Sequence, residues 1–155
     1  MFIGRYYHTV EDKGRLSLPK PLRETAQQQL NSTQDEPSWI VTRGLDGGLF
    51  LFLEKTFQQQ LADLADRTFT KKHNRDFLRL MTNDAQQVIT DGQGRINLPQ
   101  YLADQAQIKK QVVIVGSFQY VEIWSVEVYH SYLDQLSPQA EQIAEKLELK
   151  KEINE

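Results

Sequence analysis

The residues best suited to contact an anion lie in one short stretch, Val10–Pro19. Lys13 and Arg15 stand on either side of Gly14, and glycine is the residue that most readily takes the positive φ of a tight turn. Arginine offers a planar fork of donors for phosphate oxygens or for guanine O6 and N7, and lysine offers a point charge. The stretch therefore predicts a projecting hairpin of the kind that can enter a major groove.

The same stretch occurs twice in the chain. Residues 9–24 align without gaps with residues 89–104, and both contain the pattern G-R-aliphatic-x-L-P-x-x-L. The identical pairs are Gly14/Gly94, Arg15/Arg95, Leu18/Leu98, Pro19/Pro99 and Leu22/Leu102. One such turn is often only a solvated hairpin. Two copies that place an arginine at the same position favour a functional role.

A carboxylate precedes each arginine by four residues, Glu11 before Arg15 and Asp91 before Arg95. A carboxylate that accepts hydrogen bonds from turn amides or from the arginine holds that side chain in one orientation. We therefore expect both acidic residues to support the turns rather than to do chemistry.

Two β-prone runs and a helical run follow each copy, as expected for a hairpin that leads into a helix. These runs are 39–42, 49–53 and 55–65 in the first half, and 111–115, 120–124 and 126–136 in the second. A polar loop at 31–38 occurs only in the first half. Apolar spacing predicts a further helix at 71–82, and Ser137-Pro138 predicts the capped start of a C-terminal helix with one apolar stripe.

Composition excludes several classes of protein. Cysteine is absent, so disulfides and thiolate metal sites are excluded. His8, His73 and His130 match no metal-ligand spacing, and no P-loop, dinucleotide fingerprint or nucleophile elbow occurs. We expect no catalytic residue, no metal, no cofactor and no small-molecule substrate, and hence no enzyme.

Charge is unevenly distributed along the chain. The net charge of −3 argues mildly against a nucleic-acid partner. Residues 1–25, however, hold five basic and three acidic side chains, whereas residues 136–155 hold three basic and five acidic ones. Scattered surface charge is the alternative, especially for Arg5 and Lys20. No apolar run approaches the length of a membrane span, and the N-terminus lacks the features of a signal peptide, so we expect a cytoplasmic protein without a membrane partner.

With these motifs the sequence resembles the MraZ family, whose halves are similar to the AbrB-like swapped-hairpin DNA-binding module. The resemblance covers nearly the whole chain. It is carried by Met1, Phe2 and Gly4, by D-K-G-R-L-S-L-P at 12–19, by D-G-x-G-R at 91–95, and by V-G-x-F with the following E-I-W at 115–124.

The resemblance implies an α+β fold, mainly β, with two pseudo-symmetric AbrB-like swapped-hairpin β-barrel modules. On this division, module 1 spans 5–54, a helical linker spans 55–84, module 2 spans 85–129 and a C-terminal helix spans 130–155. It also implies a nucleoid-associated bacterial regulator of the cell-division and cell-wall gene cluster. Such a regulator binds repeated boxes in double-stranded promoter DNA as a homo-oligomeric ring.

The residues that this interpretation places on DNA are Lys13, Arg15, Arg23 and Arg95, and those that support the turns are Glu11, Gly14, Asp91 and Gly94. The second hairpin is electrostatically weaker, because Gln93 replaces Lys13 and Ala103 replaces Arg23. Its role is therefore open between DNA contact and structure. The alternative function is a protein-interaction or assembly module whose hairpins bind a protein partner.

Overall fold

The computed structural model describes residues 1–31, 36–68 and 70–154. The first half contains β1 (Arg5–Thr9), η1 (Asp12–Gly14), β2 (Arg15–Ser17), α1 (Lys20–Gln29), β3 (Ser38–Arg43), β4 (Leu49–Leu53), α2 (Glu54–Thr68) and α3 (Lys72–Asn83). The second half contains β5 (Gln86–Ile89), β6 (Arg95–Asn97), α4 (Gln100–Gln105), β7 (Gln111–Ser117), β8 (Tyr120–Ser125), α5 (Val126–Leu136), η2 (Ser137–Gln139) and α6 (Ala140–Asn154). The predicted strands and helices are confirmed within a few residues. In the predicted polar loop, residues 32–35 lie outside the described part of the chain.

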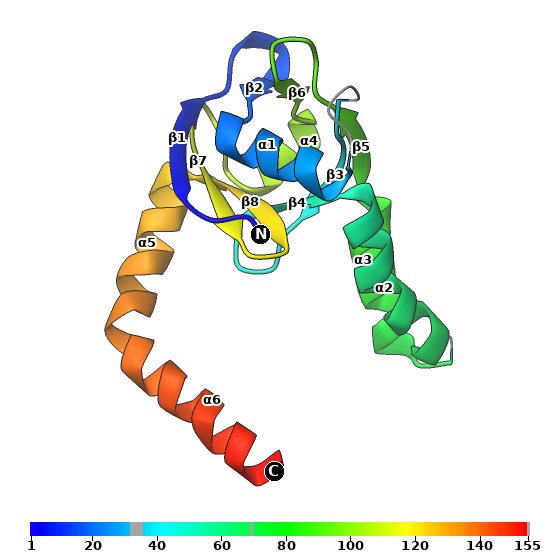
Figure 1. The fold of residues 1–155 in the computed structure, drawn as a ribbon, viewed down its shortest axis with the longest axis vertical. Helices are drawn as coiled ribbons and strands as arrows, with labels where there is room; N and C mark the ends of the chain where they lie inside the picture. The colour runs from blue at the N-terminus through cyan, green and yellow to red at the C-terminus, as the bar shows by residue number, and fades with distance from the viewer. Residues whose placement is uncertain (32–35, 69, 155) are drawn as a thin grey trace.

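The two halves interleave in one antiparallel sheet of order β1-β7-β8-β4-β3-β5. β1 of the first half pairs with β7 of the second, and β5 of the second half pairs with β3 of the first. A separate two-stranded ribbon joins β2 to β6 (Figure 1). The protein is thus a mixed α/β fold, and each half completes its sheet with a strand from the other.

One hydrophobic core spans both halves. The ribbon strands alternate in polarity, and Leu16 and Ile96, which are directly opposite each other, are both buried in this core. Trp39 of β3 and Ile114 of β7 are also buried there. Burial of each such side chain contributes about 1.5–3 kcal/mol. Because the ribbon supplies core residues from both halves, its position is fixed by packing.

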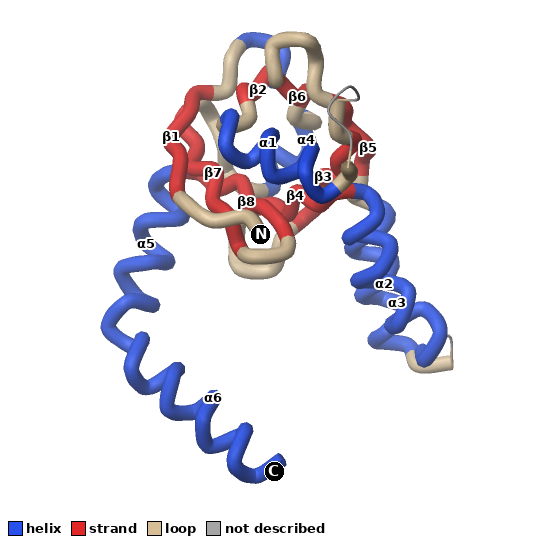
Figure 2. The backbone as a smooth tube through the Cα atoms, viewed as in Figure 1, coloured by secondary structure: helices blue, strands red, loops and turns tan. Residues whose placement is uncertain are grey.

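Helices α1 and α4 contribute to this core, whereas α2, α3 and α5 cover the other side of the sheet in two separate places. Phe50 and Phe52 of β4 pack with Met81 of α3, and Trp124 of β8 packs with Tyr129 and Tyr132 of α5. Figure 2 shows the α2–α3 hairpin leaving the sheet on one side and α5–α6 leaving it on the other. The ribbon end of the molecule carries neither helix pair.

The start of the C-terminal helix differs from the sequence prediction. Ser137 makes no side-chain capping hydrogen bond and has helical angles, φ −56° and ψ −41°. Since α5 leads directly through η2 into α6, there is no helix start for Ser137 to cap. The predicted apolar stripe does not pack on the body of the protein, and Leu147 is 66% exposed on the projecting α6 (Figure 1).

Candidate nucleic-acid interface

Two turns of the same geometry, the first turn (residues 11–15) and the second turn (residues 91–95), carry the predicted site. In the first, the Glu11 amide donates to the Arg15 carbonyl oxygen at 2.8 Å, and in the second the Asp91 amide donates to the Arg95 carbonyl oxygen at 2.8 Å. Gly14 and Gly94 have φ of +78° and +75°. The positive φ predicted for Gly14 is therefore confirmed, and Gly94 has nearly the same φ.

The two turns lie at opposite ends of the short antiparallel ribbon, near the top of Figure 1, because Arg15 is opposite Asn97 and Arg95 is opposite Ser17. The Leu18 amide donates to the Gly94 carbonyl oxygen at 3.0 Å, and the Leu98 amide donates to the Gly14 carbonyl oxygen at 2.7 Å. These reciprocal hydrogen bonds join each turn to the residue that follows the ribbon strand of the other half, although the two turns are 80 residues apart in the aligned repeat.

Both arginines lie on the outer face of the ribbon. Arg15 is paired with Asn97, and Arg95 with Ser17. Because side chains alternate along a strand, these four residues share the face opposite the buried Leu16 and Ile96. Sequence reasoning missed Ser17 and Asn97, since nothing in either copy alone indicates that β2 and β6 are neighbours.

The Asp91 carboxylate contacts both the backbone and the arginine of the second turn. The Asp91 carboxylate accepts from the Gln93 amide at 2.8 Å and the Arg95 amide at 3.0 Å, and from Arg95 Nε at 2.9 Å. The Arg95 amide and the other donors stabilise the charged form, so the pKa of the Asp91 carboxyl lies below its ordinary value. The Arg95 side chain is only 22% exposed.

Glu11 does not support Arg15 as the sequence predicted. Its carboxylate instead lies 3.6 Å from Arg95 Nη1, across the boundary between the two turns. The interleaving of the halves explains the difference, because it places the second turn's arginine within reach of the first turn's acidic residue. Arg15 is exposed, and among the described residues its guanidinium has no hydrogen-bond or ion-pair partner.

Arg23, from α1 of the first half, lies against the second turn. Its Nε donates to the Leu18 carbonyl oxygen at 3.1 Å, and its guanidinium lies directly over Gly94. A Cβ at position 94 would come within 2.5 Å of Arg23 Cζ, so the guanidinium would have to move to admit a larger residue. Lys13 is exposed at the tip of the first turn with a left-handed φ of 67°. Thus all four predicted basic residues lie on or beside the ribbon.

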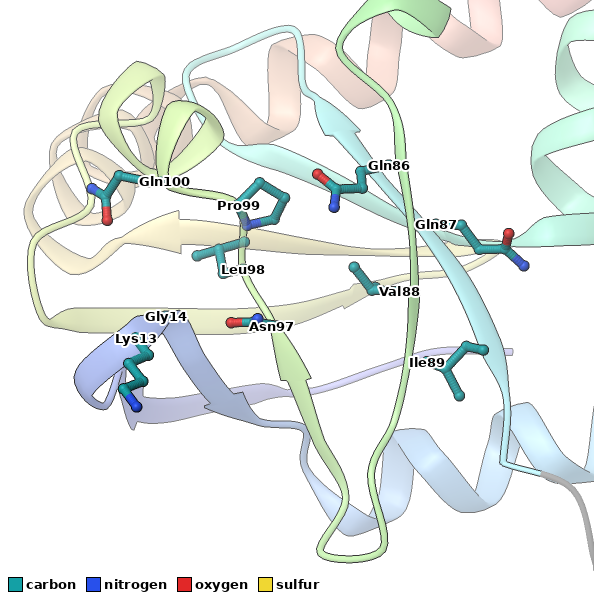
Figure 3. Close-up of a pocket in the computed structure, with 10 residues that line it drawn as sticks. All are labelled: Lys13, Gly14, Gln86, Gln87, Val88, Ile89, Asn97, Leu98, Pro99 and Gln100. Atoms are coloured by element: carbon teal, nitrogen blue, oxygen red, sulfur yellow. The ribbon is translucent and has the colours of Figure 1, made fainter.

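A cavity of about 540 Å³ opens beside the first turn. Figure 3 shows Lys13 and Gly14 on one side of it and β5 on the other, with Asn97 between them. Carboxamide side chains, which can both donate and accept hydrogen bonds, line it at Gln86, Gln87, Asn97 and Gln100. The cavity extends the polar surface of the ribbon toward the sheet edge.

The described residues hold no group of three or more His, Asp or Glu side chains placed to bind a metal ion. Within the same residues, no helix is both long and apolar enough to cross a membrane. The chemistry that this surface offers is hydrogen bonding and charge from arginine, lysine and amide groups.

The family model and the similar proteins identify the same family. The model of the family described as "MraZ protein, putative antitoxin-like" matches residues 1–80 and again residues 81–151. Proteins named Transcriptional regulator MraZ are similar along almost their whole length. That of Heliobacterium modesticaldum is 36% identical over 95% of this chain and 96% of its own. That of Carboxydothermus hydrogenoformans is 37% identical over the same shares, and that of Lactobacillus delbrueckii subsp. bulgaricus is 36% identical over 96% and 97%.

Proposed function

The chain belongs to the MraZ family, and on that basis we propose that it is a sequence-specific DNA-binding transcriptional regulator. The family implies repeated boxes in the promoter of the bacterial cell-division and cell-wall gene cluster as its target, and a cytoplasmic, nucleoid-associated location. The interleaving of β2 with β6 supports the proposal that the halves are AbrB-like swapped hairpins.

The observation that carries this proposal is the polar face of the ribbon. It presents Arg15 and Arg95 together, with Lys13 at the adjoining tip and Arg23 behind the second turn. Arginine forks read guanine in the major groove, and lysine neutralises phosphate. A two-stranded ribbon has a width that the major groove admits.

Assembly into a homo-oligomeric ring is part of the same proposal. The side chains Ile143, Leu147, Leu149 and Ile153 of α6 are between 39% and 83% exposed. Apolar side chains grouped on a projecting helix favour association with another chain. Several copies bound to adjacent promoter boxes would gain avidity of about 10²–10⁴ over one copy, which offsets the net negative charge. Light scattering after size-exclusion chromatography tests this part, and a monomer would contradict it.

Fluorescence anisotropy tests the DNA part. The intact protein is titrated into duplexes with short direct repeats and into scrambled duplexes of equal length, at two salt concentrations. We expect tighter binding to the repeats and a steep loss of affinity with salt, because phosphate contacts release counterions. Equal binding to both duplexes, or none at either salt concentration, would contradict the proposal and favour the alternative of a protein-interaction module.

A further inference from the structure

A second cavity, which we call the α5 cavity, lies outside the ribbon face at the start of α5. Its volume is about 470 Å³. It is lined by Gln107, Lys109, Lys110, Gln111 and the first residues of α5, Ser125 to Val128. Two lysines thus lie beside the N-terminus of an 11-residue helix.

Ser125 occupies the N-cap position of α5 but does not cap the helix. It is only 8% exposed, it makes no side-chain capping hydrogen bond, and no other hydrogen bond of its hydroxyl occurs within the described residues. The amides of the first turn have no acceptor inside a helix, and the helix dipole is positive at this end. An accessible hydroxyl with no partner, beside helix amides that have no acceptor inside the helix, offers donors to an anion.

The equivalent position in the first half of the chain carries an acidic side chain. Trp39 pairs with Leu53, and Val112 pairs with Ser125, so Glu54 at the start of α2 corresponds to Val126 at the start of α5. The Glu54 carboxylate accepts from Ser38 Oγ at 3.3 Å and from Gln87 Nε2 at 3.3 Å. The first half therefore has a carboxylate at the first residue of this helix, whereas the second half has Val126 there and carries its first-turn carboxylate, Glu127, one residue later.

The loop before β7 is more basic than the equivalent residues before β3. The register that aligns Trp39 with Val112 also aligns Glu36 and Pro37 with Lys109 and Lys110. Glu36 accepts a hydrogen bond from Thr90 Oγ1 at 2.8 Å, next to the second turn. In the second half, one acidic residue and a proline are thus replaced by two exposed lysines.

The α5 cavity is connected to the first turn through the backbone. The Val10 amide donates to the Lys110 carbonyl oxygen at 2.8 Å, one residue before the first turn begins. A duplex lying on Lys13 and Arg15 would therefore have a backbone strand near the lysine pair. The anions that a DNA duplex would place there are the phosphates of its backbone.

We propose that the α5 cavity binds a phosphate group of the DNA backbone, with Lys109, Lys110 and the Ser125 hydroxyl as its contacts. This inference rests on the proposed DNA-binding function and adds a sequence-independent contact to the ribbon face. Glu127 also lines the cavity, and its carboxylate opposes an incoming phosphate. The contact therefore strengthens when that charge is removed.

The direct test is anisotropy with the full chain carrying Lys109→Gln and Lys110→Gln together. The affinity should fall about tenfold for repeat and scrambled duplexes alike, because a phosphate contact carries no sequence information. The slope of log affinity against log salt should become shallower by about one. Glu127→Gln should raise the affinity for both duplexes. The matched control is Lys55→Gln with Lys71→Gln, which removes an equal charge from exposed positions on the α2–α3 hairpin and should change the slope little.

A second arm uses inorganic phosphate and the melting temperature of the intact protein. Sodium phosphate should stabilise the wild type more than sodium chloride of equal ionic strength, and this difference should disappear in the Lys109/Lys110 double variant. Stabilisation by phosphate without any effect on DNA binding would overturn the proposal in favour of a site for a free anion. If neither measurement changes in the double variant, the proposal is wrong.

The outcomes separate this inference from the proposed function. Wild-type preference for the repeats, together with unchanged affinity in the double variant, would leave the proposed function intact and refute the phosphate contact. Equal wild-type affinity for repeat and scrambled duplexes, with weaker binding of both by the double variant, would refute sequence specificity and support the contact. Absence of any DNA binding would refute both.

Discussion

The first and second turns share a backbone but differ in how their arginines are held. Arg95 is fixed by Asp91 and approached by Glu11, and it is 22% exposed. Arg15 is exposed, without such partners among the described residues. The duplicated turn thus keeps its hydrogen bonds in both copies, while the freedom of the arginine differs between them.

Under the proposed function, this difference indicates that the two arginines contribute to DNA binding in different ways. A side chain that is already ordered loses less entropy on binding, and the cost avoided is about 0.5–1.5 kcal/mol for each long side chain. A carboxylate at 2.9 Å, however, also competes with DNA for the same guanidinium. We therefore expect Arg15 to supply most of the binding energy, and Arg95 to supply orientation and stability.

Truncation of each arginine gives the largest expected effect. Arg15→Ala should lower affinity for repeat DNA about 100-fold, since a bidentate base contact contributes about 1–3 kcal/mol and several copies bind together. Its melting temperature should change little, because the side chain is exposed. Arg95→Ala should lower affinity less but should also lower the melting temperature, because Asp91 loses its side-chain partner. Anisotropy and calorimetry on both variants make the comparison.

A larger loss of affinity in Arg95→Ala than in Arg15→Ala would contradict the expected difference between the two turns. If Arg95→Ala lost more affinity at an unchanged melting temperature, the second turn would be the principal contact. If Arg15→Ala instead melted at a much lower temperature, Arg15 would be structural and the expected difference would not hold.

The two turn glycines give the next largest effect, this time on stability. Both have the same positive φ, so alanine costs about 1–2 kcal/mol at either position. A Cβ at position 14 would lie 2.6 Å from the Leu98 carbonyl oxygen, whereas one at position 94 would meet the flexible end of Arg23. We expect Gly14→Ala to lose about 1–3 kcal/mol more than Gly94→Ala, because backbone yields less than a side chain.

Urea unfolding of the two glycine variants measures that difference. Gly94→Ala should in addition weaken DNA binding, since Arg23 must move to admit the new methyl group. Equal losses of stability would show that the ribbon relaxes around both turns, and that the contact of Gly14 with Leu98 does not constrain it.

Much of the fold could be predicted from the aligned repeat, and the strand partners could not. Alternation in Arg15–Leu18 indicates a strand with one buried face, but a period of two does not identify the neighbouring strand. Consequently the pairing of β2 with β6 and the place of Asn97 in the site were not foreseen. The wrong partner predicted for Glu11 has the same origin. Spacing within one copy indicates Arg15 as its partner, whereas the fold places Glu11 beside Arg95.

The charge pattern of the α5 cavity shows a second limit of sequence reasoning. Lys109 and Lys110 are an ordinary surface pair in the sequence, and they gain meaning only beside Ser125 and the start of α5. The aligned pair Glu36-Pro37 became recognisable as their counterpart only from the strand register. The loop of the first half is longer, so the sequence alignment alone does not extend to these positions.

The two supporting carboxylates should differ in their effect on stability. Asp91→Asn keeps one oxygen for the turn amides but places an amide NH₂ group against Arg95, so we expect a lower melting temperature. Glu11→Gln removes only a contact at 3.6 Å from a side chain that is 57% exposed, and such pairs contribute little. Calorimetry at neutral pH compares the two. A larger loss for Glu11→Gln would place the principal support of Arg95 in the first turn.

The smallest expected effect is the pH dependence of the second turn. The pKa of Asp91 is lowered in the folded protein by the Arg95 amide and the other donors around it. A lowered pKa means that the contribution to stability is complete above the unfolded value of about 3.9 and is lost as the pH falls through the folded value. The free energy of unfolding of the wild type should therefore exceed that of Asp91→Asn by a constant amount from pH 7 to about 5. The difference should then shrink at lower pH. Urea unfolding at successive pH values measures it, with Glu11→Gln as the baseline for the first turn. A difference that stays constant down to pH 3 would mean that the Asp91 carboxylate does not hold the second turn, and that the two turns differ only in their exposed charge.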